Sequence, residues 1–226
     1  LISYIADCFD NFDKDINCRC IVLCSDGKHF CAGANFGKDR DMQDKADPYS
    51  ELYTQAVRLF KNKKPVIAAV QGGAIGGGLG LSLVADFRIG CPESRFSANF
   101  SRLGFHQGFG TTVTLPRVVG PQNAAMMMLT GRRLKGQEAF DIGLIDYLVP
   151  LKEVRSKAIE LAEEISEAGP LAVQSIRATI RAGLAEQVEE IVSWELSEQV
   201  RLQSTKDFKE GIKASLERRK PKFEGS

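Results

Sequence analysis

The sequence has no excess of charge of either sign and no long apolar run. Its 226 residues carry 30 Lys and Arg against 29 Asp and Glu, so no net field favours binding to nucleic acid or to an anionic membrane surface. No apolar run approaches the roughly 20 residues that a membrane-spanning helix needs. The first residues, LISYIADCF, lack the basic region and the cleavage site of a signal peptide. A small molecule is therefore the expected partner, with no nucleic acid and no membrane.

The six cysteines include no CxxC pair, so the sequence offers neither a zinc signature nor a disulfide framework. Cys18, Cys20 and Cys24 share one parity on an expected strand, which predicts that they are buried thiols. Free buried thiols are typical of a reducing environment. We therefore expect the cytoplasm or another reducing intracellular compartment.

Apolar helices alternate with short apolar strands through the first two thirds of the chain, which predicts an α/β fold. Strands end by Val149, and four successive helical patterns follow. We therefore predict two parts, a core over residues 1–149 and a helical region over residues 150–226. The helices expected in the second part cover residues 152–168, 171–182, 186–205 and 208–219.

The most informative stretch is KPVIAAVQGGAIGGGLGLSLVAD, residues 64–86, where a strand over 66–70 leads through five glycines into an apolar helix over 79–85. Its spacing fits neither a dinucleotide fingerprint nor a phosphate-binding P-loop. A nucleophile elbow at Ser82 comes within one residue of its motif, since Val84 stands where the motif needs glycine, and a serine hydrolase is kept as a weaker alternative. What remains is a site where backbone N–H groups approach a negative oxygen. Close packing alone would account more easily for one or two glycines than for five.

Several segments resemble the crotonase superfamily, the enoyl-CoA hydratase/isomerase group. Residues 65–72, 76–78 and 85–89 resemble its core motif, and residues 30–34 resemble its second motif. Further similar segments lie at 131–132, 138–145 and 210–219. The resemblance implies a crotonase-like spiral of ββα turns followed by a C-terminal helical region that assembles a homotrimer or a dimer of trimers. Members normally have a β-hairpin and a CoA-contacting loop before the helix that Leu1 begins, so we expect this chain to be a fragment.

The resemblance also implies a chemistry, in which two backbone N–H groups stabilise the enolate of a thioester. These groups carry over onto Ala34 and Gly77. The implied substrate is an acyl-CoA, and no cofactor is expected beyond its CoA moiety. Further substrate contacts are expected from small residues and neighbours in the two motifs, namely Ala32, Gly33, Asn35, Phe36 and Gly76.

The sequence departs from the hydratases of this family at the two positions where they carry glutamates that position and activate water. Those positions hold Gly80 and Phe100. Neither residue can transfer a proton, so the two-glutamate hydration mechanism is not available. Phe100 is expected to line the acyl pocket, with packing in the core as the alternative.

His106 is the candidate to replace the missing acid or base, because histidine titrates near neutral pH. A capping or supporting histidine is the alternative. Gln107 could orient a substrate carbonyl or a water, or else face solvent. Asp86 is expected to cap the apolar helix or to form hydrogen bonds near its end.

Two functions follow. The first is an acyl-CoA-processing enzyme that stabilises a thioester enolate and carries out isomerisation, C–C cleavage or thioester hydrolysis. The second is a crotonase-fold protein that binds acyl-CoA without catalysis.

Overall fold

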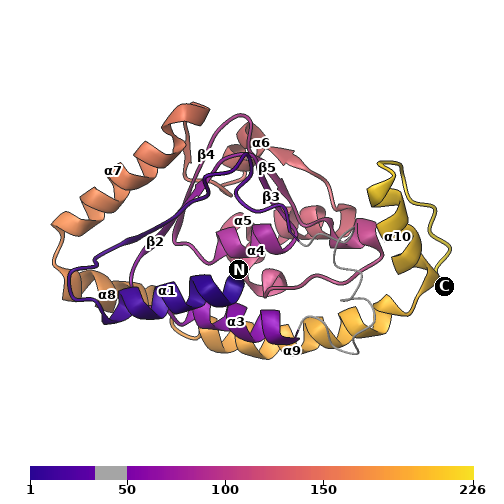
Figure 1. Cartoon of the computed structure of the whole chain (residues 1–226), viewed down its shortest axis with the longest axis horizontal. Coiled ribbons are helices and arrows are strands. Elements are labelled where there is room, and N and C mark those ends of the chain that lie inside the picture. Colours follow the sequence, from indigo (N-terminus) through magenta and orange to yellow (C-terminus); the bar gives the residue numbers. More distant parts are fainter. Residues whose placement is uncertain (34–49) are drawn as a thin grey trace.

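The computed structural model describes residues 1–33 and 50–226 (Figure 1). Its main sheet has four parallel strands in the order β1-β2-β4-β7. Their bounds are β1 (Ile21–Leu23), β2 (Val66–Val70), β4 (Phe87–Gly90) and β7 (Tyr147–Leu148). A second sheet has the order β3-β5-β6, with β3 parallel to β5 and β5 antiparallel to β6. Its strands are β3 (Gly73–Ile75), β5 (Arg95–Ser97) and β6 (Leu134–Lys135).

The chain repeats one unit, in which a strand of the main sheet is followed by a strand of the second sheet and then by a helix. The first complete unit is β2, β3 and α4 (Gly77–Leu83), and the next is β4, β5 and α5 (Thr111–Thr130). Successive units stack in register, with Ile67 beside Phe87 in one sheet and Gly73 beside Arg95 in the other. This is the spiral of ββα turns that the resemblance implied.

Strand β2 is buried along its whole length because helices cover both of its faces. Val66, Ala68 and Val70 face the main core. Ile67 and Ala69 face the opposite way and join a second cluster with residues of α7 (Val154–Glu167). Figure 1 shows α7 on one side of β2, with α1 (Ile2–Lys14), α3 (Ser50–Phe60) and α9 (Leu184–Gln203) together on the other.

The remaining elements complete the core and carry the chain to its C-terminal end. Helix α5 is broken at Gly120, which has φ 77° and ψ 160°, so it forms two helical segments. The other elements are η1 (Asn99–Leu103), α6 (Gly136–Asp141), η2 (Leu151–Glu153), α8 (Pro170–Ile180) and α10 (Lys206–Leu216). The boundary between the two predicted parts, at residues 149 and 150, stays a prediction. Helices on its C-terminal side pack on the core, with α7 on the strands and α9 on α3.

The structure corrects two expectations. The glycine cluster contains a strand of its own, β3, and the helix begins at Gly77 instead of residue 79. The prediction of buried thiols is wrong for Cys24, which is exposed, while Cys18 and Cys20 are only partly buried. Strand β1 has just three residues, so Cys24 already lies in the turn that follows it.

Candidate active site

Three consecutive glycines turn the chain from β3 into α4 and serve different purposes. Gly76 adopts φ 56° and ψ −119°, a conformation that favours glycine. A Cβ at Gly78 would overlap the carbonyl group of Cys31, so this glycine allows two backbone segments to pack together. A Cβ at Gly77 would meet no atom of residues 1–33 or 50–226 within 4 Å. Gly77 therefore faces open space within the described part of the chain.

The N–H group of Gly77 has no hydrogen-bond acceptor among the described residues. As the first residue of α4 it has no acceptor within the helix. Among the residues that the structure describes, no carbonyl or side-chain oxygen accepts a hydrogen bond from it. The neighbouring Gly76 N–H, by contrast, is bound to the Ser97 carbonyl at 2.9 Å.

A second backbone segment runs beside this turn. Cys31 donates from its N–H to the Gly73 carbonyl and accepts at its own carbonyl from Ile75 N–H, both at 3.0 Å. Gly33 follows with φ 84°, and a Cβ there would lie 2.8 Å from the carbonyl oxygen of Ile75. The chain is thus held close to β3 up to Gly33. The predicted site residues Ala34, Asn35 and Phe36 lie outside the described residues.

One pocket of about 830 Å³ opens at this place. Five of the predicted site residues line it together, namely Ala32, Gly33, Gly76, Gly77 and Phe100. Burial divides the lining into two zones. The exposed zone, here called the rim, carries charged side chains and includes Lys28, Glu51, Glu93 and Arg133. The buried zone, here called the apolar floor, consists of Phe100, Leu103, Phe105 and Phe109.

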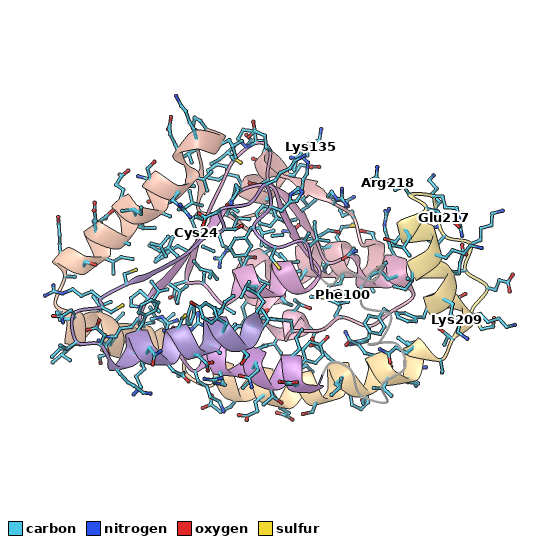
Figure 2. The ribbon with its side chains drawn as sticks, in the orientation of Figure 1. Cys24, Phe100, Lys135, Lys209, Glu217 and Arg218 are labelled. Carbon is cyan, nitrogen blue, oxygen red and sulfur yellow. The ribbon has the colours of Figure 1, made fainter. Side chains whose placement is uncertain are left out.

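The apolar floor is supported by aromatic contacts. The ring of Phe100 stacks on that of Phe105, with centroids 6.4 Å apart and planes inclined by 27°. Phe105 in turn meets Phe208 of α10 at 4.9 Å. Figure 2 shows Phe100 near the centre of the molecule, whereas Lys209 and Glu217 project from the end that carries α10. The C-terminal helix therefore supports the floor from behind.

Two histidines lie near the pocket in different ways. His29 lines it, and its Nδ1 accepts a hydrogen bond from the Gly73 N–H at 3.0 Å, which leaves the other ring nitrogen to carry the proton. His106 and Gln107 are not among the described residues that line the pocket. The ring Nδ1 of His106 lies 3.0 Å from the Gln107 carbonyl oxygen. The structure thus does not bring these two predicted residues together with the other five.

Comparisons with known proteins agree with this architecture. The family model described as enoyl-CoA hydratase/isomerase matches residues 1–226. A crotonyl-CoA hydratase of Syntrophomonas wolfei is 35% identical over 205 residues, which cover 90% of this chain and 79% of that protein. A crystal structure of an enoyl-CoA hydratase/isomerase from Pseudoalteromonas atlantica has a TM-score of 0.88 at 26% identity, covering 99% of this chain and 89% of that one.

The chain belongs to the enoyl-CoA hydratase/isomerase family. It shares the crotonase fold of that family and is an acyl-CoA-processing enzyme of this class. Members with different reactions resemble it to a similar degree. The mitochondrial Delta(3,5)-Delta(2,4)-dienoyl-CoA isomerase of Pongo abelii is 30% identical over 237 residues, which cover 96% of this chain and 71% of that protein. The family therefore fixes the class of enzyme and leaves the reaction open.

Hydratases of the family are expected to carry glutamates at two positions, which hold Phe100 and Gly80 here. Both of these residues have apolar surroundings in the structure. Phe100 forms part of the apolar floor. Gly80 is buried beneath Phe109, because a Cβ at Gly80 would lie 2.7 Å from both Cβ and Cδ1 of that phenylalanine. The ring of Phe109 thus occupies the space that a side chain at position 80 would enter.

Sequence reasoning missed four residues that shape this pocket. Phe105 and Phe109 were hidden in a loop whose side-chain directions depend on its backbone conformation. Glu195 and Gln199 of α9 hold that loop from a distant part of the chain. The local signal that could have pointed to the loop is the glycine on each side of Phe109.

The carboxyl group of Glu195, which binds the loop that carries Phe109, has a pKa that burial raises above its ordinary value. Hydrogen bonds from Thr112 and from the backbone of Gly110 act in the opposite direction without cancelling this effect. Within the described part of the chain, no group of three or more His, Cys, Asp and Glu residues could hold a metal ion. The same part contains no helix long and apolar enough to cross a membrane.

Proposed function

We propose that this protein binds an acyl-CoA with the thioester oxygen at the N–H group of Gly77 and stabilises the enolate formed by loss of an α-proton. The reaction that the site favours is movement of a double bond within the acyl chain, without addition of water. The alternative is a protein that binds acyl-CoA without turning it over.

The observation that carries this proposal is the free N–H of Gly77 at an open wall of the pocket. A donor held in place where negative charge develops stabilises a transition state strongly, and loss of one such donor typically lowers the rate by about 10²- to 10³-fold. The family resemblance assigns the second donor to Ala34. Since that residue lies outside the described residues, the structural support rests on Gly77.

The apolar floor argues against hydration. Addition of water to an enoyl-CoA needs a group that takes a proton from the water. The carboxylates among the described lining residues, Glu51 and Glu93, lie on the rim and not on the apolar floor, and Gly80 is covered. A dry floor is compatible with proton transfer between carbon atoms. His106 stays a prediction for the proton carrier, with no support from its position.

The rim supports binding of the CoA moiety. Lys28 and Arg133 are exposed there with Glu51 and Glu93, and Arg95 also lines the pocket. Basic side chains at the mouth of a pocket attract the phosphate groups of an entering ligand. The acyl chain would then extend inwards to the apolar floor.

Exchange of the α-proton in D₂O tests the enolate directly. Saturated acyl-CoAs, 2-enoyl-CoAs, 3-enoyl-CoAs and dienoyl-CoAs are incubated with the protein, and mass spectrometry follows both deuterium uptake and products. We expect deuterium at the α-carbon of saturated acyl-CoAs and interconversion of 2- and 3-enoyl isomers. Binding without exchange across the panel would overturn the proposal in favour of the non-catalytic alternative. Loss of exchange in His106→Ala would assign the proton carrier.

We also propose a homotrimer or a dimer of trimers, in line with the resemblance. Large apolar side chains are exposed on α8 and α9, among them Leu171, Ile180 and Trp194 with 82%, 71% and 62% of their surface accessible. Such exposed large apolar side chains on consecutive helices support an interface between copies of the chain. All six cysteines are free, which supports the proposal of a reducing compartment.

A further inference from the structure

Phe109 has an unusual backbone conformation. Its φ of 64° lies in the left-handed region, and among the described residues Arg218 is the other non-glycine residue there. A bulky side chain disfavours this conformation, so it persists where its surroundings impose it. The neighbouring Gly110 adopts φ 70°, and Gly108 leaves room for Tyr53 and Gln199, which a Cβ there would overlap. Helix α9 then fixes the loop.

Two buried side chains of α9, one turn apart, hold the loop at both ends. Gln199 donates from Nε2 to the carbonyl oxygens of His106 at 2.9 Å and Gln107 at 3.1 Å. The carboxylate of Glu195 accepts hydrogen bonds from Gly110 N–H at 2.8 Å and Thr112 N–H at 3.1 Å. Both side chains are fully buried. Phe109 lies between these two attachment points.

Gln199 also connects the loop to another wall of the pocket. The hydroxyl of Tyr53, a residue of α3 that lines the pocket, donates to Oε1 of Gln199 at 2.7 Å. Helix α9 packs against both α3 and α5 (Figure 1). The direction of the Phe109 side chain is therefore set by contacts outside its own loop.

This direction places the ring over Gly80 and in the apolar floor. Phe109 is 1% exposed and lines the pocket. The absence of a side chain at Gly80 leaves the space that the phenylalanine fills. Side chains at positions 80 and 109 would thus compete for one space beside the pocket, and here Phe109 fills that space.

We propose that Phe109 determines acyl-chain specificity by closing the inner end of the pocket beside Gly80, and that Glu195 and Gln199 act through the loop as its positioning residues. This inference rests on the proposed function, because it concerns the acyl end of the same site. The ligand class that it predicts is a CoA thioester with a short, apolar acyl group.

Binding of saturated acyl-CoAs of increasing length tests the proposal without requiring turnover. Isothermal titration calorimetry gives the Kd of butyryl-CoA and of octanoyl-CoA for the wild-type protein and for Phe109→Ala. The wild type is expected to prefer butyryl-CoA. In Phe109→Ala, the Kd ratio of octanoyl- to butyryl-CoA should fall by about tenfold or more, since the added methylenes become buried. Phe9→Leu, a core change in α1 away from the pocket, should leave the ratio unchanged.

The possible failures are distinguishable. An unchanged ratio in folded Phe109→Ala overturns this inference and leaves the proposed function intact. A wild-type protein that binds neither acyl-CoA overturns the proposed function and this inference together. A wild type that already binds octanoyl-CoA more tightly than butyryl-CoA overturns the idea that the pocket is closed.

The positioning role is tested by combining variants. Gln199→Ala should lower the same Kd ratio, and Gln199→Ala with Phe109→Ala should lower it no further than Phe109→Ala alone, because the glutamine acts through the phenylalanine. Gln203→Ala on the same helix is the matched control and should leave the ratio unchanged. Additive effects of the two substitutions would overturn the positioning role.

Discussion

Arg177 donates from Nε to Oδ2 of Asp86 at 2.7 Å, and this ion pair fastens helix α8 to the place where α4 leads into β4. The same carboxylate accepts from the Val66 N–H at 2.8 Å and from Arg181 at 3.0 Å. Arg177 also donates to the Asn62 carbonyl at 2.6 Å. One carboxylate thus connects the start of β2 with the C-terminal helices.

Loss of this carboxylate should destabilise the fold. In Asp86→Asn two largely buried guanidinium groups lose their counter-charge, and breaking a buried pair in this way typically costs about 3–5 kcal/mol. We expect a correspondingly lower free energy of unfolding in a urea titration. Asp26→Asn removes the exposed partner of Arg155 and should leave the midpoint unchanged. Equal midpoints for the two variants would contradict the proposed importance of Asp86.

Gly77 and Gly78, which are neighbours in α4, should differ in their tolerance of alanine. Gly78→Ala introduces a Cβ that overlaps the Cys31 carbonyl, so it should lower the melting temperature. Gly77→Ala adds its Cβ to open space and keeps the N–H, so the melting temperature should stay close to that of the wild type. Calorimetry compares the two variants directly.

Gly77→Pro removes the backbone N–H of residue 77 and therefore tests the catalytic role of that group. Proline is tolerated at the first position of a helix, so Gly77→Pro should fold. It should lower α-proton exchange by at least about 10²-fold relative to Gly77→Ala. Comparable exchange rates in these two variants would show that the oxyanion binds elsewhere.

Glu195 should make stability depend on pH in a defined direction. Burial raises the pKa of this carboxyl above 4.5 in the folded protein, so folding takes up a proton between 4.5 and the folded pKa. The contribution is fully present below 4.5 and is lost as the pH rises through the folded pKa. Urea titrations across this range should show the wild type losing stability relative to Glu195→Gln as the pH rises, with a constant difference above the window. A wild type that gains stability relative to Glu195→Gln as the pH rises would contradict the raised pKa.

The cysteines should differ in their reaction with iodoacetamide. Cys24 is exposed, whereas Cys91 is fully buried. Burial raises the pKa of Cys20 to about 11 and also raises that of Cys18, which leaves little of the reactive thiolate at pH 8. Peptide mapping after brief labelling should find Cys24 modified before Cys18 and Cys20, and Cys91 modified after unfolding. Early modification of Cys91 would contradict the packing of β4 against α7.

The sequence allowed the repeating strands and the glycine turn to be predicted because both depend on local signals. An uninterrupted apolar run gives β2 its bounds, and the motifs around Gly77 indicated the family. Strand β3 was missed because a three-residue strand that begins with glycine carries no periodic pattern. Cys24 was predicted to be buried because side-chain parity was extended beyond the end of β1.

The sequence predicted only those parts of the pocket that are formed by residues close together in the chain. Phe109 reaches Gly80 through the fold, and Glu195 reaches the loop from α9, so neither contact leaves a signal in nearby sequence. His106 was selected for its chemistry and its loop. The direction of a side chain in such a loop follows from backbone angles that depend on α9.

The contact between Gly80 and Phe109 also makes the two positions interdependent. A glutamate introduced at position 80 alone would place its Cβ 2.7 Å from both Cβ and Cδ1 of Phe109, so the phenylalanine would have to move before a carboxylate could enter the pocket there. An engineered hydratase site in this protein therefore requires a smaller residue at position 109 together with the glutamate at position 80.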